Sequence, residues 1–388
     1  MSWRVPLADV RMEQSDIEAV LDCLRSGWLT MGPRTAAFEE AAADHLGVEH
    51  AVAVSSGTAA LHLACIAAGL GPGDEAIVPG ITFVATAAAV RYTGADAVIC
   101  EVRGPHDMNI DPGDVERRIT PRTKAVLAVH FGGYPAAIPE LRALCDRHGI
   151  VLIEDCAQGI GARVDPAGHQ AGVLGDFGCF SMFSKKQLCV GEGGILTTHD
   201  EAVATRARSL RAHGLTSGTW DRHRAYGGGY DVTDFGLNYR IDEPRAALAL
   251  SRLTRLDDET EARRGVARAY RDALRGLDGV DVVWDDRASE RSSHFAFAVL
   301  LPDRDRRDSF RAFLHERGVQ TTFYPALHRF SEYRRLSPTL SLPRVEEAAD
   351  RHCAIPMSSH MAKADLDLVI DVVRAGVASV AEPQEALA

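Results

Sequence analysis

Two adjacent lysines, Lys185 and Lys186, follow an aromatic and apolar run from Phe177 to Phe183 and precede the glycine-rich segment 191–194. A lysine amine must be neutral to attack a carbonyl group, and both burial and a neighbouring cation favour the neutral form. Lys185 could supply part of the second effect for Lys186. A Lys-Lys pair taken alone is more often a surface feature, so the order and spacing of other motifs have to decide.

A carboxylate, Asp155, stands at the end of the apolar run 150–154, which is typical of a buried strand. A carboxylate there is costly to desolvate and should have a cationic partner, for which a protonated pyridine nitrogen would serve. The alternatives are a loop cap or a metal ligand. Metal is the weaker alternative, because no His or second carboxylate stands nearby at ligand spacing.

The turn Ser55-Ser56-Gly57-Thr58 lies where an apolar strand pattern ends and an Ala-rich helical pattern begins. Free backbone N–H groups and the positive end of a helix dipole converge at such a turn, which could therefore bind a phosphate. An ordinary Ser/Thr helix cap is the simpler interpretation of this turn alone.

Strand-like and helical patterns alternate through the first two thirds of the chain, which predicts an α/β fold with a mostly parallel sheet between helices. The ligand site of such a sheet lies beyond the carboxyl ends of its strands. A long helical pattern over 243–277 then leads to a smaller α/β region, so we expect a large domain over 1–246 and a small domain over 247–388. The small domain should contain strands at 280–284, 294–301 and 319–325, and helices at 308–317 and 365–380.

Composition excludes several classes of protein. The 388 residues are 46% hydrophobic and 25% charged, which is typical of a globular chain long enough for two cores. Acidic residues (54) outnumber basic ones (43) and no dense basic block occurs, so nucleic acid is a poor candidate partner. Eight scattered cysteines without a C-x-x-C pair indicate reduced thiols, and no secretory or membrane-spanning pattern is found. We therefore expect a cytoplasmic enzyme.

Several motifs occur together in one order, and this order resembles the DegT/StrS family of nucleotide-sugar aminotransferases, fold type I enzymes that use pyridoxal 5'-phosphate. The resemblance extends from GWLTMGP (27–33) to FYPALH (323–328). Any one of these motifs would be a weak signal, whereas their agreement in order is a strong one. Between those ends stand SSGTAAL (55–61), PGITFVATAAAV (79–90), IEDCAQGIGA (153–162), GDFGCFSMFSKKQLCVGEGG (175–194) and GLNYRIDE (236–243).

The resemblance implies a role for each matching residue. The family pattern F-S-x-x-x-x-K, followed by GEGG, selects Lys186 rather than Lys185 as the Schiff-base lysine. It also implies that Asp155 contacts the pyridine nitrogen, Gln158 the ring hydroxyl and Phe83 the ring face. Gly57, Thr58 and Ser181 would hold the phosphate, and Asn238 would reach it from the neighbouring subunit of a homodimer, while Tyr324 and His328 would lie near the sugar nucleotide.

Simpler interpretations remain open for several of these residues. Phe83 could belong to the core, Ser181 could satisfy a backbone group, Gln158 could cap a turn and Asn238 could sit in a tight bend. His213 is a further candidate, although a structural histidine is at least as common. Met182 departs from the aromatic residue usual in the family, which bears on local packing.

The implied reaction is transamination, with L-glutamate as the probable donor in relatives. The segment 27–33 is more similar to members that aminate C4 than to those that aminate C3, which favours dTDP-4-keto-6-deoxyglucose as substrate and a 4-amino-4,6-dideoxy sugar as product, in an antibiotic aminosugar pathway such as that of an enediyne. The alternatives are C3 amination, a sugar dehydratase, in which histidine replaces the lysine, and a regulator that binds the cofactor without turnover.

Overall fold

A computed structural model describes residues 3–224 and 229–381, and within these ranges the largest element is a seven-stranded sheet in the order β1-β9-β8-β7-β6-β2-β3. The pairs β3/β2, β2/β6, β6/β7 and β7/β8 are parallel, whereas β9 is antiparallel to both β8 and β1. The expected mostly parallel sheet is confirmed. Its strands are β1 (His50–Val54), β2 (Glu75–Pro79), β3 (Asp96–Cys100), β6 (Thr123–Val129), β7 (Val151–Asp155), β8 (Phe177–Ser181) and β9 (Gly194–Thr198).

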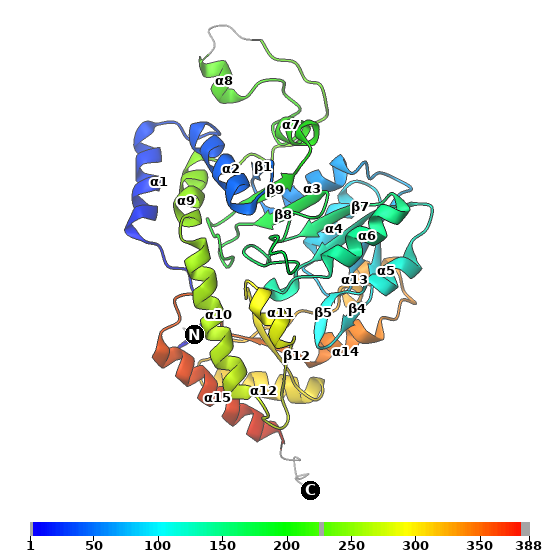
Figure 1. The fold of residues 1–388 in the computed structure, drawn as a ribbon, viewed down its shortest axis with the longest axis vertical. Helices are drawn as coiled ribbons and strands as arrows, with labels where there is room; N and C mark the ends of the chain where they lie inside the picture. The colour runs from blue at the N-terminus through cyan, green and yellow to red at the C-terminus, as the bar shows by residue number, and fades with distance from the viewer. Residues whose placement is uncertain (1–2, 225–228, 382–388) are drawn as a thin grey trace.

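Helices cover both faces of this sheet (Figure 1). Side chains alternate between the faces along each strand, so that in β2 Ala76 and Val78 join one apolar cluster and Ile77 joins the other. The first cluster packs against α3 (Gly57–Ala67), α4 (Ala85–Tyr92) and α7 (Glu201–Leu210). The second packs against α2 (Pro33–Leu46), α5 (Pro112–Arg118), α6 (Ile138–His148) and α9 (Glu243–Leu253).

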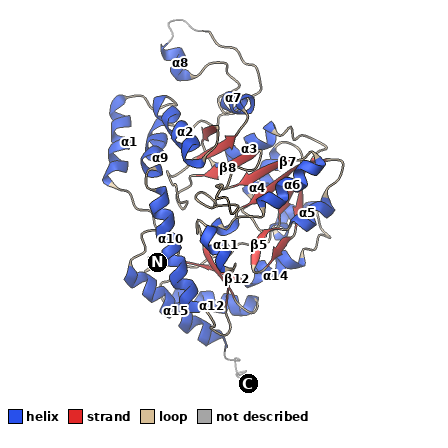
Figure 2. Cartoon of the chain, viewed as in Figure 1, coloured by secondary structure: helices blue, strands red, loops and turns tan. Residues whose placement is uncertain are grey.

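Smaller elements extend this layered body (Figure 2). A hairpin projects from the sheet, and two helices lie apart from it at the periphery. These elements are α1 (Gln14–Ser26), β4 (Val102–Gly104), β5 (Asp107–Ile110), the 3-10 turn η1 (Phe131–Gly133) and α8 (Thr219–Arg224).

The C-terminal region forms a three-stranded antiparallel sheet, β10-β11-β12, covered by helices. A third apolar cluster joins α10, α12 and α15 to this sheet and includes Val5 from the N-terminus. The domain boundary at 246/247 stays a prediction. The elements are α10 (Leu256–Leu274), β10 (Asp281–Val282), α11 (Asp286–Arg291), β11 (Phe297–Leu300), α12 (Arg304–Glu316), η2 (Leu327–Arg329), α13 (Ser331–Leu336), α14 (Pro343–Arg351), β12 (His352–Ile355) and α15 (Lys363–Ala381).

Two expectations for this region were wrong. The long helix expected over 243–277 is two helices, separated at Thr254 and Arg255, where the Thr254 hydroxyl donates to the Ser251 carbonyl (2.7 Å). The strand expected at 319–325 makes only single bridges, at Val319 and Thr322, because it divides its pairing between an N-terminal segment and β12. The third strand of the small sheet is β12, which the sequence analysis did not identify.

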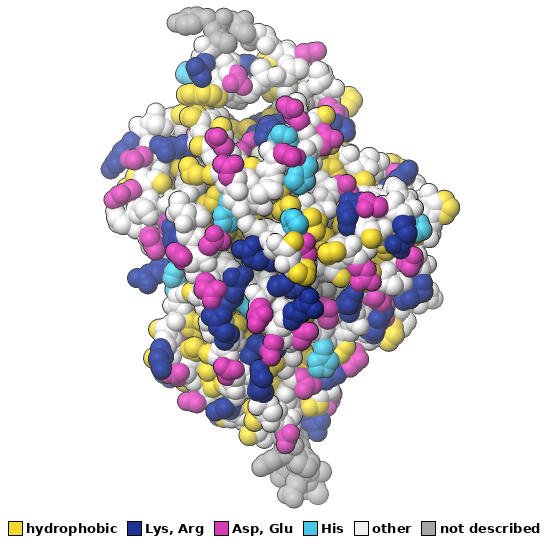
Figure 3. Space-filling view, viewed as in Figure 1, with side chains coloured by type: hydrophobic (Ala, Val, Ile, Leu, Met, Phe, Trp, Pro, Cys, Tyr) yellow, Lys and Arg dark blue, Asp and Glu magenta, His cyan; other side chains and the backbone are white. Residues whose placement is uncertain are grey.

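The surface has no single sign of charge on the face shown in Figure 3, where basic and acidic side chains are interspersed. Among the residues that the structure describes, no helix has both the length and the apolar character needed to cross a membrane.

Candidate active site

A cavity of about 500 Å³ lies beyond the carboxyl ends of β7 and β8, the place expected for a parallel sheet. Its walls come from the start of α3, the segment before α4, the loops after β7 and β8, and parts of the C-terminal region. Eight of the residues selected from the sequence line it, namely Gly57, Thr58, Phe83, Asp155, Gln158, Ser181, Lys186 and Tyr324. Asn238 and His328 do not line it.

Asp155 ends β7 and is 4% exposed. Burial raises the pKa of its carboxyl group above the ordinary value, because water no longer solvates the charge. Several groups oppose this effect, His130 among them. The Thr86 hydroxyl donates to Oδ2 (2.7 Å), the Ala157 N–H donates to Oδ1 (3.1 Å), and the positive charge of Lys186 also favours the carboxylate.

Thr86, in the first turn of α4, is a site residue that the sequence analysis missed. It is fully buried, and its hydroxyl oxygen lies 2.7 Å from that of Thr82. Because the single hydroxyl proton of Thr86 goes to Asp155, Thr82 is the donor in this second contact. The two threonines thus form a hydrogen-bond chain that ends on the carboxylate. The two threonines stand four residues apart in ITFVAT, but Thr82 lies in the segment before α4, so a helical pattern gave no signal for this contact.

A second buried carboxylate, Glu154, lies beside His130 and Cys156, a grouping that the sequence spacing did not reveal. His130 Nδ1 accepts from the Ala136 N–H (3.1 Å), so the proton is on Nε2, which donates to Glu154 (2.9 Å). Burial holds the pKa of the Cys156 thiol well above its ordinary value, which disfavours the thiolate that a metal needs. Glu154 also accepts from the N–H groups of Gly172 and Gly175. We interpret this group as a structural hydrogen-bond network.

Lys186 is half-buried, and its Nζ lies 4.3 Å from the centre of the Phe295 ring. Burial lowers the pKa of its amine to about 8, while the charge of Asp155 acts in the opposite direction. A larger fraction of Lys186 than of an exposed lysine is therefore neutral near pH 7, as a nucleophile requires. Lys185, by contrast, is exposed at the cavity. Among the described residues no ion pair joins Lys186 to Asp155, although both line the same space.

The turn at 55–58 begins α3 as expected. The Ser56 hydroxyl accepts from the Ala59 N–H (3.1 Å) and so caps the helix, while the N–H groups of Gly57 and Thr58 have no acceptor within the helix. A Cβ atom on Gly57 would lie 2.8 Å from Cβ of Ser181, which explains the glycine and shows how closely β8 approaches the turn. The cap interpretation and the anion-binding interpretation therefore apply to different residues of one turn.

The loop after β7 is tied to the loop that carries Lys186. The Gln158 side-chain oxygen accepts from the Gly132 N–H (2.7 Å), which leaves its NH₂ group available at the cavity. Gln187, which follows Lys186, is buried and donates to the Gln158 carbonyl (3.2 Å) and to the Ser293 hydroxyl (3.0 Å). Gln187 is a second positioning residue that the sequence analysis missed, since only the fold brings these three segments together.

Phe83 and Tyr324 are two of the aromatic residues that line the cavity. Phe83 is 66% exposed, so it is not a core residue and its ring is available to a planar partner. Tyr324 packs edge-to-face on Phe131 with 4.9 Å between ring centres. Burial raises the pKa of Tyr324 to about 12, so its hydroxyl stays protonated at neutral pH and can donate a hydrogen bond.

His328 and Asn238 lie outside this cavity, and their expected roles stay predictions. His328 is buried in η2, where Nε2 contacts Oε1 of Glu346 at 3.1 Å. Asn238 is exposed and forms a single bridge with Ala212.

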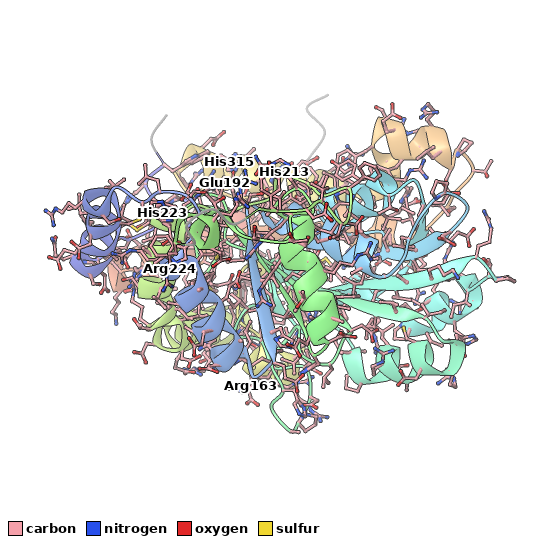
Figure 4. The ribbon with its side chains drawn as sticks, turned by 90° about the horizontal axis from the view of Figure 1, so that it is seen from above. Arg163, Glu192, His213, His223, Arg224 and His315 are labelled. Atoms are coloured by element: carbon pink, nitrogen blue, oxygen red, sulfur yellow. The ribbon has the colours of Figure 1, made fainter. Side chains whose placement is uncertain are left out.

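His213 is also exposed, and it is not among the cavity-lining residues; Figure 4 labels it together with Glu192, which does line the cavity. Its backbone has a φ of 67°, and its N–H donates to the Leu237 carbonyl (2.9 Å). A structural role for His213 is thereby favoured.

Met182, which stands where relatives usually have an aromatic residue, packs into the protein interior. Met182 is fully buried, and a Cβ on Gly193 would lie 2.8 Å from its terminal methyl carbon. The flexible methionine side chain therefore fills the space beside the glycine-rich segment without disturbing the position of Lys186.

Comparison with known proteins gives one family over almost the whole chain. The model of the DegT/DnrJ/EryC1/StrS aminotransferase family matches residues 10–374.

Solved structures agree with this match. The aminotransferase TlmJ from Streptoalloteichus hindustanus is 35% identical with a TM-score of 0.90, and the match covers 97% of this chain and 100% of that one. DesV from S. venezuelae, solved in complex with a ketimine intermediate, is 34% identical with a TM-score of 0.87, over 97% and 99% of the two chains. The sugar aminotransferase Spr1654 from Streptococcus pneumoniae in its PLP form shares the fold (22% identity, TM-score 0.88, 97% and 99% coverage).

These matches indicate pyridoxal 5'-phosphate as the cofactor, and the cavity fits it. A buried carboxylate with a hydrogen-bond chain behind it suits a protonated pyridine nitrogen, and two free N–H groups beside Ser181 suit a phosphate. The same cavity is lined by an amine with a lowered pKa and by an exposed aromatic ring. The N–H donors of the turn, the Asp155 carboxylate and the Lys186 amine are therefore all present at the carboxyl ends of the strands.

Replacing Thr86 with Val removes the hydrogen bond to Asp155 while keeping the side-chain shape. A hydrogen bond to a charged group contributes about 1.5–3 kcal/mol, so we expect the affinity of the apoprotein for pyridoxal phosphate to fall by about 10- to 100-fold. Fluorescence titration measures this change. Thr86→Ser, which keeps the hydroxyl, should retain most of the affinity; equal loss in both variants would show that packing rather than the hydrogen bond matters.

The pKa of Lys186 can be measured in cofactor-free protein by competitive acetylation followed by mass spectrometry. Because burial lowers this pKa, reactivity should rise through a midpoint near pH 8. Asp155→Asn removes a charge that favours the ammonium form, so the midpoint should move to lower pH. A midpoint near the ordinary lysine value of 10.5, or a shift upward in the variant, would contradict this account.

Proposed function

Since the chain belongs to the DegT/DnrJ/EryC1/StrS aminotransferase family and is a pyridoxal phosphate-dependent sugar aminotransferase, we propose that it aminates the keto carbon of a nucleotide-linked sugar. One observation carries this proposal. A lysine whose pKa is lowered to about 8 and a buried, hydrogen-bonded aspartate line one cavity beside an anion-binding turn.

The proposed roles follow from the chemistry of each group. Pyridoxal phosphate, when bound, supplies an electron-withdrawing ring that stabilises negative charge on a substrate carbon. The carboxylate of Asp155 would keep the pyridine nitrogen protonated, and the NH₂ group of Gln158 would donate to the ring hydroxyl. Lys186 Nζ accepts a proton as a neutral amine and returns it as an ammonium group, which its lowered pKa permits near neutral pH. Phe295 holds this amine at the cavity wall.

We further propose dTDP-4-keto-6-deoxy-D-glucose as the acceptor, a 4-amino-4,6-dideoxy sugar nucleotide as the product and L-glutamate as the donor. The similarity of segment 27–33 to C4-aminating members supports this choice, as does the placement of Tyr324 in the cavity wall. Such a product would belong to aminosugar biosynthesis, of the kind that serves antibiotic pathways. Lys186 disfavours a dehydratase, which has histidine at this position, and the intact set of Lys186, Asp155 and Gln158 at one cavity disfavours a regulator without turnover.

We also propose a homodimer in which Asn238 completes the phosphate site of the partner subunit. Asn238 is exposed and lies outside the cavity of its own chain. Its segment is fixed close behind the turn at 55–58, because the Ser55 N–H donates to the Tyr239 carbonyl (2.8 Å). Phe235, in the same stretch of chain, is a large apolar side chain that is 99% exposed, as is usual for surfaces that become buried on association.

The substrate proposal is tested by incubating the holoenzyme with L-glutamate and a panel of 3-keto and 4-keto sugar nucleotides, with NMR of the products. We expect amination at C4 of the 6-deoxy sugar. Lys186→Ala should abolish turnover, whereas Lys363→Ala, at an exposed lysine that begins α15, should retain it. A 3-amino product would contradict the regiochemistry, and turnover by Lys186→Ala would contradict the mechanism.

Subunit complementation tests the shared site. Lys186→Ala and Asn238→Ala proteins should each be inactive or weak, but a mixture refolded together forms hybrid dimers with one intact site. Half of the dimers are hybrids, so activity should recover to about a quarter of the wild-type value. The matched pair Lys186→Ala and Asp155→Asn, which both alter the same subunit's site, should not recover. Failure of the first pair to recover would mean that Asn238 does not act across an interface.

A further inference from the structure

The N-terminal segment Trp3–Ala8, here called the strap, is bound along the C-terminal region. The N–H groups of Arg4 and Val5 donate to the Gly318 carbonyl (2.9 and 3.0 Å), and the Gln320 N–H donates to the Val5 carbonyl (3.0 Å). Val5 is 4% exposed and belongs to the third apolar cluster. The strap is therefore held both by backbone hydrogen bonds and by burial.

The end of the strap forms part of the cavity wall. The Leu7 N–H donates to the side-chain oxygen of Gln320 (2.8 Å), and the Met357 N–H donates to the Leu7 carbonyl (3.0 Å). These bonds fix Leu7 and Ala8 at the cavity, which Ile355 and Met357 also line. Four aliphatic or thioether side chains thus adjoin one another, and they are here called the apolar wall.

The apolar wall differs chemically from the rest of the cavity. Ile355 and Met357 are almost completely buried, and the side chains of the wall carry no N–H or O–H donor. The backbone groups of Leu7 are already used by Gln320 and Met357. A hydroxyl group placed against this wall would lose its water without gaining a hydrogen-bond partner from these side chains, whereas a methyl group there would lose nothing.

We propose that the strap determines sugar specificity: the apolar wall, in which Leu7 and Ala8 are the half-buried members and Leu7 the larger side chain, selects a nucleotide-linked sugar that lacks a hydroxyl group on the carbon lying against it. This inference rests on the proposed function, and it assigns the preference for a 6-deoxy sugar to particular residues. Leu7 is a specificity-determining residue and takes no part in moving protons.

The test compares two unreactive ligands that differ only in the 6-hydroxyl group, dTDP-glucose and dTDP-6-deoxyglucose, by calorimetric titration of the holoenzyme. A hydrophobic pocket rejects an added hydroxyl group by up to about 100-fold, so we expect the wild-type protein to bind the deoxy compound about 10- to 100-fold more tightly. Leu7→Ser supplies a hydrogen-bond partner and should reduce this ratio to less than about threefold. Leu7→Ala, which opens the wall to water, is the second variant and should also lower the ratio.

Val10→Ser is the matched control, because Val10 is 39% exposed beyond the strap and does not line the cavity. It should leave the ratio unchanged, and in all variants the absorbance of the bound cofactor should match the wild type. Equal binding of both ligands by the wild-type protein, or an unchanged ratio in both Leu7 variants, would overturn the specificity role while leaving the aminotransferase proposal intact. Failure to bind either ligand, together with no turnover on the keto sugar panel, would overturn both.

Discussion

The cost of burying the Asp155 carboxylate is the constraint on which the site depends. A charge in this position is stable only if hydrogen bonds and opposite charge replace lost water. The structure supplies the hydroxyl of Thr86, the N–H of Ala157 and the charge of Lys186, and burial still raises the carboxyl pKa. The same burial lowers the lysine pKa. One low-dielectric cavity therefore prepares both groups, and a cationic ring between them would relieve the remaining cost.

Hydrogen bonds connect the loops around Asp155 and Lys186 to the C-terminal region. Gln158 accepts from Gly132, Gln187 joins the Gln158 carbonyl to Ser293, and the strap joins the cavity to β12 and its neighbours. The reactive lysine is thus positioned by segments from both halves of the chain. Asp155 and Lys186 lie at the carboxyl ends of the strands, whereas the C-terminal region and the strap supply other walls of the cavity.

Sequence patterns predicted a mostly parallel sheet because strands such as β6 and β7 are short apolar runs bounded by turn residues. Sequence patterns failed to predict the pairing of a segment whose backbone hydrogen bonds go to two different partners. Residues 319–325 look like a strand, yet their partners are the strap on one side and β12 on the other, so they form only single bridges. Thr86 was missed because two threonines four residues apart, the first of them before α4, have no distinctive signature until the carboxylate partner of Thr86, 69 residues away, is placed beside it.

The sequence by itself determined the α/β class and the family resemblance, and it selected Lys186 and Asp155 as candidate site residues, because these follow from local periodicity and from motifs that keep their order along the chain. The tertiary structure alone decided which residues share the cavity, that His328 contacts Glu346 instead of lining it, and that an N-terminal strap closes one wall. Contacts between segments hundreds of residues apart, such as Leu7 with Gln320, depend on three-dimensional packing, on which local sequence carries no information.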